Sequence, residues 1–224
     1  MKINFQSISE NKPYVFSCST LFTVLSLLTM FYDKVTIFFF LNTFHHQWID
    51  FGMLFITNCG TGLFSLLVLG AVCLTKNWRL ARNILLTFLV SGALVQTLKP
   101  LYSAPRPKAI ISADAYSWFF EGITHSGLTS FPSGHATTIF ALATVLAFTS
   151  KKKYITLVYF FFATLVAYSR VYLGQHFMED VLAGAILGTL TTTTLTIFTS
   201  RFTFFNKQLS PKKQFFSQWT SNLR

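Results

Sequence analysis

Stretches of apolar side chains alternate with short polar segments along nearly the whole 224-residue chain. Six stretches hold no charged side chain, and they cover residues 14–32, 51–75, 83–98, 136–150, 154–169 and 181–200. About 20 apolar residues in a helix cross ~30 Å of hydrocarbon, and a single segment inside lipid satisfies its own backbone hydrogen bonds only as a helix. The pattern therefore predicts an all-α integral membrane bundle of six transmembrane helices.

Two segments outside these stretches have the pattern of helices that lie on a membrane surface. Between the first two stretches, apolar residues recur at helical spacing and end in a tryptophan, which favours the headgroup level: Ile37, Leu41, Phe44 and Trp48. The basic tail 210–224 has a similar pattern. We predict an interfacial helix at each place. The adjacent His45 and His46 could contact a substrate or a metal. Because they have no carboxylate in helical register, they are interpreted instead as solvated residues at a helix end.

No internal repeat or low-complexity linker divides the chain, so we predict a single membrane domain over residues 1–224. Its core covers about residues 50–200, and the tails 1–13 and 201–224 are expected at the cytoplasmic interface. Dense prolines after Lys99 cannot continue a helix. The segment 99–132 is therefore predicted to be the largest outer loop.

Three aromatic residues in this loop, Trp118, Phe119 and Phe120, have two possible roles. They either dip into the bilayer surface as a lid or pack within the loop itself. The pattern does not decide between the two.

The composition agrees with a membrane protein, because 52% of the residues are hydrophobic, 11% are charged and the mean hydropathy is +0.50. A net charge of +11 would indicate a nucleic-acid partner in a soluble protein. With the N-terminus in the cytoplasm, however, 13 of the 18 Lys and Arg residues fall on the inner side and 5 on the outer side. This is the bias of the positive-inside rule. We therefore expect no nucleic-acid partner, and both termini in the cytoplasm.

The same topology sends six of the seven acidic residues and all five histidines to the outer side. Exclusion of acidic residues from cytoplasmic loops would explain only part of this, because acidic residues contribute little to that rule. The outer side, periplasmic in a cell (inner) membrane, therefore holds nearly all the side chains capable of acid–base chemistry.

Three segments with reactive side chains fall at the outer ends of spans: KPLYSAPRP at 99–107, PSGH at 132–135 and SRVYLGQHFMED at 169–180. They contain three permanent cations, Lys99, Arg106 and Arg170, whose natural counter-ion is phosphate or carboxylate. Ser133 and Gly134 open a predicted helix, where backbone N–H groups attract an anion. The three segments together predict an oxyanion site.

Two histidines can divide the chemistry of phosphate ester cleavage. His176 and Asp180 are four residues apart, so on a helix the carboxylate can hold the imidazole N–H and raise its basicity. One histidine cannot attack phosphorus and protonate the leaving oxygen at once, and His135 is available for the second role. Each segment alone is typical of ordinary structure; the combination is not.

Together the three segments resemble the signature of the type 2 phosphatidic acid phosphatase superfamily: Lys, six residues, Arg-Pro; Pro-Ser-Gly-His; and Ser-Arg, five residues, His, three residues, Asp. The resemblance implies that His176 is the nucleophile that forms a phosphohistidine, that Asp180 orients it and that His135 protonates the leaving oxygen. The residues it implies for phosphate binding are Lys99, Arg106, Ser133, Gly134 and Arg170. It implies neither a metal nor another cofactor, because the cations supply the charge stabilisation.

The expected function is hydrolysis of a lipid phosphomonoester or pyrophosphate at the outer membrane face. The membrane branch of the superfamily acts on phosphatidic acid, phosphatidylglycerol phosphate, polyprenyl pyrophosphate and lipid A phosphates, and the pattern does not choose among them. Short apolar stretches of 16, 15 and 16 residues at 83–98, 136–150 and 154–169 place the cations near the headgroup plane, which favours a lipid. Two alternatives remain: a lipid phosphotransferase with the same phosphohistidine, and a non-catalytic lipid-phosphate binder or flippase.

Overall fold

The computed structural model describes residues 11–208, and all the regular structure among them is helical. The helices are α2 Lys12–Phe31, α3 Lys34–Leu41, α4 Gln47–Thr57, the 3-10 turn η1 Asn58–Gly60, α5 Gly62–Leu74, α6 Trp78–Tyr102, α7 Pro107–Ile110, α8 Gly134–Thr149, α9 Lys153–Tyr172 and α10 Met178–Gln208. The predicted all-α membrane class is confirmed. The predicted interfacial helix at 210–224 lies outside the described residues.

The predicted count of six spans is not confirmed exactly. Among the described residues, four helices are long and apolar enough to cross a membrane: α2, α6 with its extension to Ile110, α9 and α10. A fifth span results when α4, η1 and α5 are counted together, although they bend by 62°. Helix α8, the remaining predicted span, is apolar but only 16 residues long.

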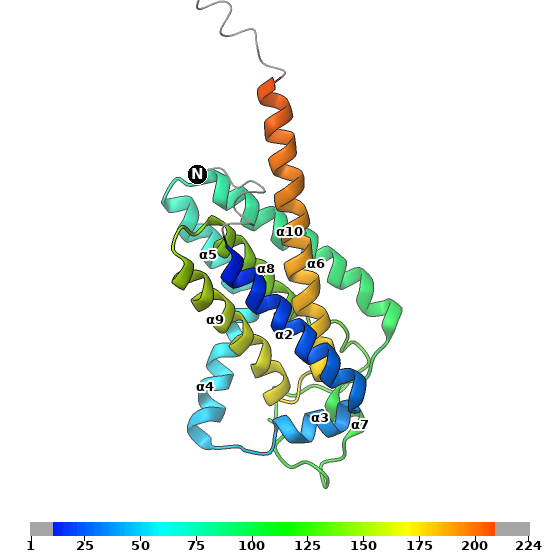
Figure 1. Ribbon diagram of the computed structural model, residues 1–224. Coiled ribbons are helices and arrows are strands. Elements are labelled where there is room, and N and C mark those ends of the chain that lie inside the picture. The colour runs from blue at the N-terminus through cyan, green and yellow to red at the C-terminus, as the bar shows by residue number, and fades with distance from the viewer. Residues whose placement is uncertain (1–10, 209–224) are drawn as a thin grey trace, which may run out of the picture.

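Helix α8 lies at the centre of the bundle, between α10, α9 and α6 (Figure 1). Its sequence is apolar on all sides, which is typical of a helix surrounded by protein. Eleven of its 16 residues are buried. Because neighbouring helices rather than lipid surround it, α8 is held in place by protein packing along its whole length.

Helices α8 and α10 approach each other closely at two glycines, Gly184 and Gly188. A Cβ at Gly184 would lie 2.4 Å from the Ser133 carbonyl oxygen, and one at Gly188 would lie 2.3 Å from the Thr137 carbonyl oxygen. The glycines are four residues apart, the small-residue spacing that lets membrane helices touch through their backbones. One turn further along α10, the Thr192 hydroxyl donates to the Ala141 carbonyl at 3.2 Å.

Three predictions about individual segments were wrong. The second apolar stretch is broken at Asn58–Gly60 instead of forming one straight span. The third continues past Lys99 and Pro100 to Tyr102, because a proline in the last turn of a helix removes only one backbone hydrogen bond before the helix ends. The first interfacial helix ends at Leu41, so that Phe44 lies in a loop and Trp48 begins the second span.

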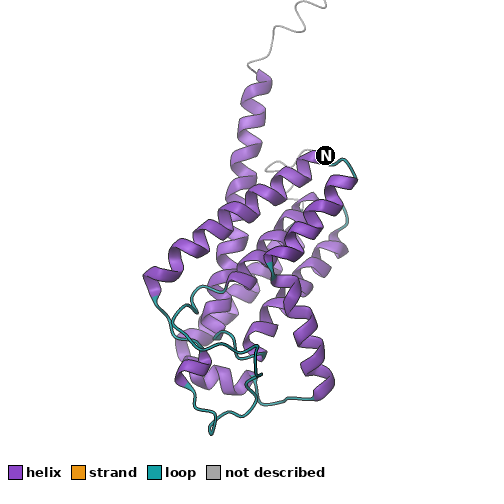
Figure 2. Ribbon diagram, turned by 180° about the vertical axis from the view of Figure 1, so that it is seen from behind, coloured by secondary structure: helices purple, strands orange, loops and turns teal. Residues whose placement is uncertain are grey.

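The described chain begins and ends at the same end of the bundle, and the long segment 103–133 lies at the opposite end together with α3 and α7 (Figures 1 and 2). This arrangement agrees with the predicted topology, in which both termini share a side. The three reactive segments therefore meet at the end of the bundle that faces away from the termini.

We predict that Gly188→Ala lowers the melting temperature of the detergent-solubilised protein. The added methyl group would overlap the Thr137 carbonyl oxygen and force α8 and α10 apart, a kind of overpacking that costs about 1–3 kcal/mol. Gly92→Ala on α6 is the matched control, because its Cβ meets nothing within 4 Å. Equal melting temperatures for the two variants would contradict the close α8–α10 contact.

Candidate active site

His135 lies at the start of α8, packed against the break in the second span. Ser133 caps this helix, and its hydroxyl oxygen accepts from the Ala136 N–H at 3.5 Å. A Cβ at Gly60 in η1 would lie 2.9 Å from Cβ of His135. The broken span thus brings backbone without a side chain against the imidazole, which explains why the sequence has a glycine at this position.

The start of α8 differs in one respect from the predicted anion site. The Ser133 N–H donates to the Asp180 carbonyl oxygen at 2.9 Å, so this N–H is not available to an anion. Gly134 follows it, and a Cβ there would meet only Val95, at 3.8 Å. The space for an anion at this helix end therefore lies beside Gly134.

His176 lies in the short turn between α9 and α10, almost completely buried at 2% exposure. Gly174 makes the turn with φ +62°, a left-handed conformation that favours glycine. Burial lowers the pKa of His176 to about 4, with a further lowering by Arg170 and a partial offset by Asp180. The imidazole is therefore neutral at pH 7.

Ser130 stands between His176 and Asp180, a role that the sequence analysis missed. The predicted pairing is present as a contact of 3.6 Å between His176 Nδ1 and Asp180 Oδ2, which is longer than a normal hydrogen bond. The buried Ser130 hydroxyl donates to Asp180 Oδ2 at 2.6 Å and lies 3.1 Å from His176 Nδ1. The Phe177 N–H also donates to Asp180 Oδ2, at 2.9 Å.

This row of contacts determines which nitrogen of His176 carries the proton. A serine hydroxyl has one hydrogen, and an ionised carboxylate can only accept. Since Ser130 gives its hydrogen to Asp180, its oxygen must accept from Nδ1–H of His176. The neutral imidazole therefore has its lone pair on Nε2.

The three predicted cations surround the two histidines. Lys99, Arg106 and Arg170 all interact electrostatically with His135, and the two arginines also interact with His176. Arg170 Nη1 donates to the Thr57 hydroxyl at 2.6 Å. Its buried Nε has no hydrogen-bond partner among the described residues. A buried guanidinium N–H without an acceptor is costly, and a phosphate oxygen would satisfy it.

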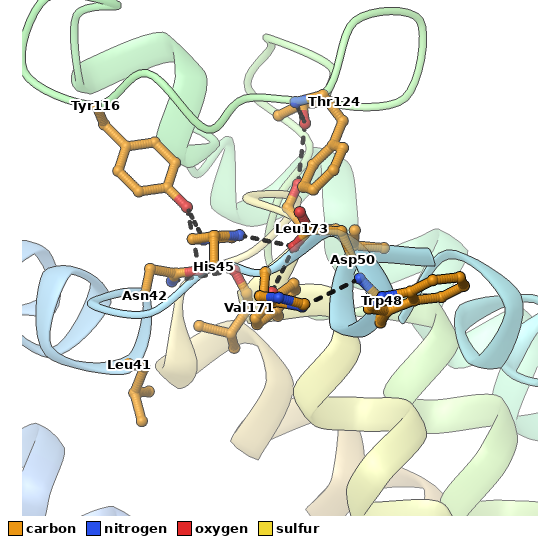
Figure 3. Close-up of polar contacts among 12 residues, drawn as sticks. Leu41, Asn42, His45, Trp48, Asp50, Tyr116, Thr124, Val171 and Leu173 are labelled. Atoms are coloured by element: carbon orange, nitrogen blue, oxygen red, sulfur yellow. Dashed lines mark hydrogen bonds and ion pairs between the residues drawn. The ribbon is translucent and has the colours of Figure 1, made fainter. Parts of the chain in front are cut away.

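The outer loop is packed against the bundle around His45 (Figure 3). The His45 side chain is fully buried, with Nδ1 3.1 Å from Asp50 Oδ1 and Nε2 2.7 Å from the Tyr116 hydroxyl. The Tyr116 hydroxyl also donates to Asn42 Oδ1 at 3.2 Å. The interpretation of His45 as solvated was wrong, because its side chain is buried. Asp50 was not considered as its partner because the two are five residues apart, a spacing outside the helical register.

The aromatic residues Trp118 and Phe119 of this loop pack against other side chains of the protein. Trp118 stacks on His45 with ring centroids 5.1 Å apart, and Phe119 packs against Phe38 and Tyr116. A Cβ at Gly174 would lie 2.9 Å from the Phe119 ring. The loop therefore contacts the turn that carries His176.

All eight predicted site residues lie at this end of the bundle: His135, His176, Asp180, Lys99, Arg106, Arg170, Ser133 and Gly134. Four further residues contact this site and were not predicted: Ser130, Thr57, Gly60 and Gln175. Ser130 had a usable signal, since it is a polar residue two positions before the PSGH segment and next to a predicted helix start. The other three are recognisable only from contacts between segments distant in the sequence.

A family model described as the PAP2 superfamily matches residues 80–204. Phosphatidylglycerophosphatase B of Bacillus subtilis is 33% identical over 157 residues, which cover 64% of this chain and 71% of the relative. Undecaprenyl-diphosphatase BcrC of Bacillus subtilis is 28% identical over 146 residues, with the same coverage of 64% and 71%. The crystal structure of Aquifex aeolicus LpxE aligns with a TM-score of 0.64 at 28% identity, and covers 73% of this chain and 94% of its own.

We predict that Ser130→Ala lowers kcat by about 10²-fold, because a misplaced reacting group costs that much in a positioned site. Without the hydroxyl, only the longer contact of 3.6 Å between His176 Nδ1 and Asp180 Oδ2 holds the imidazole. Ser126→Ala, at an exposed position of the same loop, is the control. Rates are measured well below both melting temperatures. A Ser130→Ala rate within twofold of wild type would show that the serine does not orient the imidazole.

Proposed function

The chain belongs to the PAP2 superfamily, and on this basis we propose that it is an integral membrane phosphatase that hydrolyses a lipid phosphomonoester or pyrophosphate through a phosphohistidine on His176. One observation carries the proposal. The row His176, Ser130, Asp180 leaves the Nε2 lone pair of a neutral imidazole available in a site where Arg106 and Arg170 interact with His176. In this proposal residues 1–224 form one phosphatase domain.

In the first step, Nε2 of His176 attacks phosphorus. The N–P bond forms as the bond from phosphorus to the lipid oxygen breaks, and His135 gives its proton to that oxygen. The cations around His135 oppose a positive imidazole, and a bound phosphate offsets them. The substrate therefore stabilises the proton that its own leaving group requires.

In the second step, His135 takes a proton from water and the water oxygen attacks phosphorus. The N–P bond breaks, its electron pair returns to Nε2, and inorganic phosphate leaves. Asp180 remains ionised throughout and stabilises the positive charge that develops on His176, through Ser130.

Five residues are proposed to form the phosphate site: Lys99, Arg106, Arg170, Ser133 and Gly134. Arg170 contributes the buried Nε that has no acceptor among the described residues, and Ser133 acts by capping the helix that presents Gly134. Three cations at one site repel a divalent metal ion and supply the charge stabilisation themselves. We therefore propose a reaction that requires neither a metal nor another cofactor.

Exposed aromatic residues at this end of the bundle support a lipid substrate. Trp48 is 79% exposed, Tyr102 60% and Trp118 51%. Trp and Tyr gather at the headgroup level of a membrane. A phosphate held among the cations at the same level belongs to a lipid already in that leaflet.

The proposed location is the outer face of a cell membrane, with both termini in the cytoplasm. The charge bias of 13 against 5 basic residues supports this orientation. The separation of the described chain ends from the site also supports it (Figure 1). Relatives whose names specify phosphatidylglycerophosphate and undecaprenyl diphosphate define the first substrates to test.

The proposal is tested by phosphate release from purified protein in detergent, with phosphatidic acid, phosphatidylglycerol phosphate, undecaprenyl pyrophosphate and lipid A as substrates and a chelator present throughout. We expect turnover of at least one lipid, and a loss of at least about 10³-fold in His176→Ala, because the nucleophile is gone. His46→Ala, at an exposed histidine of the same end, should retain activity.

Two outcomes would contradict this proposal. Retained activity in His176→Ala would exclude His176 as the nucleophile. Transfer of labelled phosphate to an added acceptor lipid, with none released to water, would identify a phosphotransferase instead.

A further inference from the structure

Arg106 is held from one side by Gln175, the residue directly before His176. Arg106 Nη1 donates to the Gln175 carbonyl oxygen at 3.1 Å and to its side-chain Oε1 at 2.9 Å. Gln175 is buried at 2% exposure, whereas Arg106 is only half-buried. The buried residue is therefore the fixed partner and the guanidinium is the group that it holds.

The other end of the Gln175 amide binds the outer loop, where Nε2 donates to the Ile123 carbonyl oxygen. A guanidinium can only donate and a carbonyl oxygen can only accept. A side chain between them must accept at one end and donate at the other, which a neutral amide does. The orientation of the amide follows from these two partners.

Ile123 lies on a part of the loop that is itself fixed. The Thr124 hydroxyl donates to the Leu173 carbonyl at 2.9 Å, and the Phe120 N–H donates to the same hydroxyl at 3.0 Å (Figure 3). Further along the loop, the Gly127 carbonyl oxygen accepts from the backbone N–H of Arg106 at 2.9 Å. The loop thus fixes both the backbone of Arg106 and, through Gln175, its side chain.

We propose that Gln175 is a positioning residue that orients Arg106 for the phosphate, an inference that rests on the proposed function. Among the described residues, the side-chain hydrogen bonds of Arg106 use Nη1. Nε and Nη2 remain for the oxygens of a phosphate, and together they form the two-pronged contact that arginine offers to this group. Position 175 is one of the five unspecified residues between Ser169-Arg170 and His176, so the signature pattern does not require glutamine there.

The neutral amide also leaves the charge of Arg106 intact. A carboxylate at position 175 would hold Nη1 equally well but would compete with the phosphate for the same cation. Gln175 therefore orients the guanidinium without neutralising it, which suits a site whose anion arrives with the substrate.

The test measures the dissociation constant of inorganic phosphate by calorimetry on the full-length protein in detergent. Gln175→Met keeps the chain length and removes the amide. We expect the phosphate dissociation constant and the KM for the lipid to rise about tenfold, as for loss of one hydrogen bond to a charged group, with kcat within about threefold. Gln175→Leu should give the same result, and Gln96→Met at an exposed position of α6 should give none.

A double-mutant cycle identifies Arg106 as the residue through which Gln175 acts. In an Arg106→Lys background, Gln175→Met should change phosphate binding by less than about twofold, because lysine has no fork to orient. An equal loss of phosphate affinity in the wild-type and Arg106→Lys backgrounds would overturn the inference. Unchanged phosphate affinity in both Gln175→Met and Gln175→Leu would also overturn it. Failure of the wild-type protein to bind phosphate would also overturn it.

This experiment separates the inference from the proposed function. Wild-type protein that binds phosphate but hydrolyses no lipid would contradict the proposed phosphatase activity. The binding cycle would still decide the role of Gln175, because it requires no turnover.

Discussion

The backbone contact between α8 and α10 is the constraint on which the site depends. Gly184 and Gly188 let the two helices touch, and the contact brings the Ser133 N–H to the Asp180 carbonyl oxygen. Ser130, three residues before Ser133, then reaches the Asp180 carboxylate and the His176 imidazole. A wider separation of the helices would move Ser130 away from His176 and Asp180 and so break the contacts that it makes with both. The packing of small residues therefore sets the position of the proposed nucleophile.

The hydrogen bonds of the cationic residues explain how the site stays ready for an anion. Arg170 donates to a hydroxyl, of Thr57, and Arg106 donates to the neutral oxygens of Gln175. The Asp180 carboxylate is engaged instead by Ser130 and the Phe177 N–H. Neutral acceptors orient a guanidinium without neutralising its charge, and like charges held together repel one another. In the proposed function, a bound phosphate offsets that repulsion.

The sequence predicted the helical membrane class and the gathering of the eight proposed site residues at one end of the bundle, because apolar length and motif spacing are local properties of the chain. It failed where contacts between distant segments decide the structure. The break at Asn58–Gly60 follows from packing against His135, and the burial of His45 follows from Tyr116, 71 residues away. Ser130 was missed for a different reason. The spacing of His176 and Asp180 suggested a direct hydrogen bond alone, whereas the two atoms lie 3.6 Å apart and Ser130 contacts both.

The central claim is that phosphate is transferred to Nε2 of His176, and mass spectrometry of the trapped intermediate tests it most directly. His135→Ala protein mixed with p-nitrophenyl phosphate, whose leaving group needs no acid, should accumulate the intermediate because no base activates water. After an alkaline quench, which preserves phosphohistidine, the account predicts one phosphate on His176. A phosphate on another residue, or rapid phosphate release without any phosphorylated protein, would contradict it.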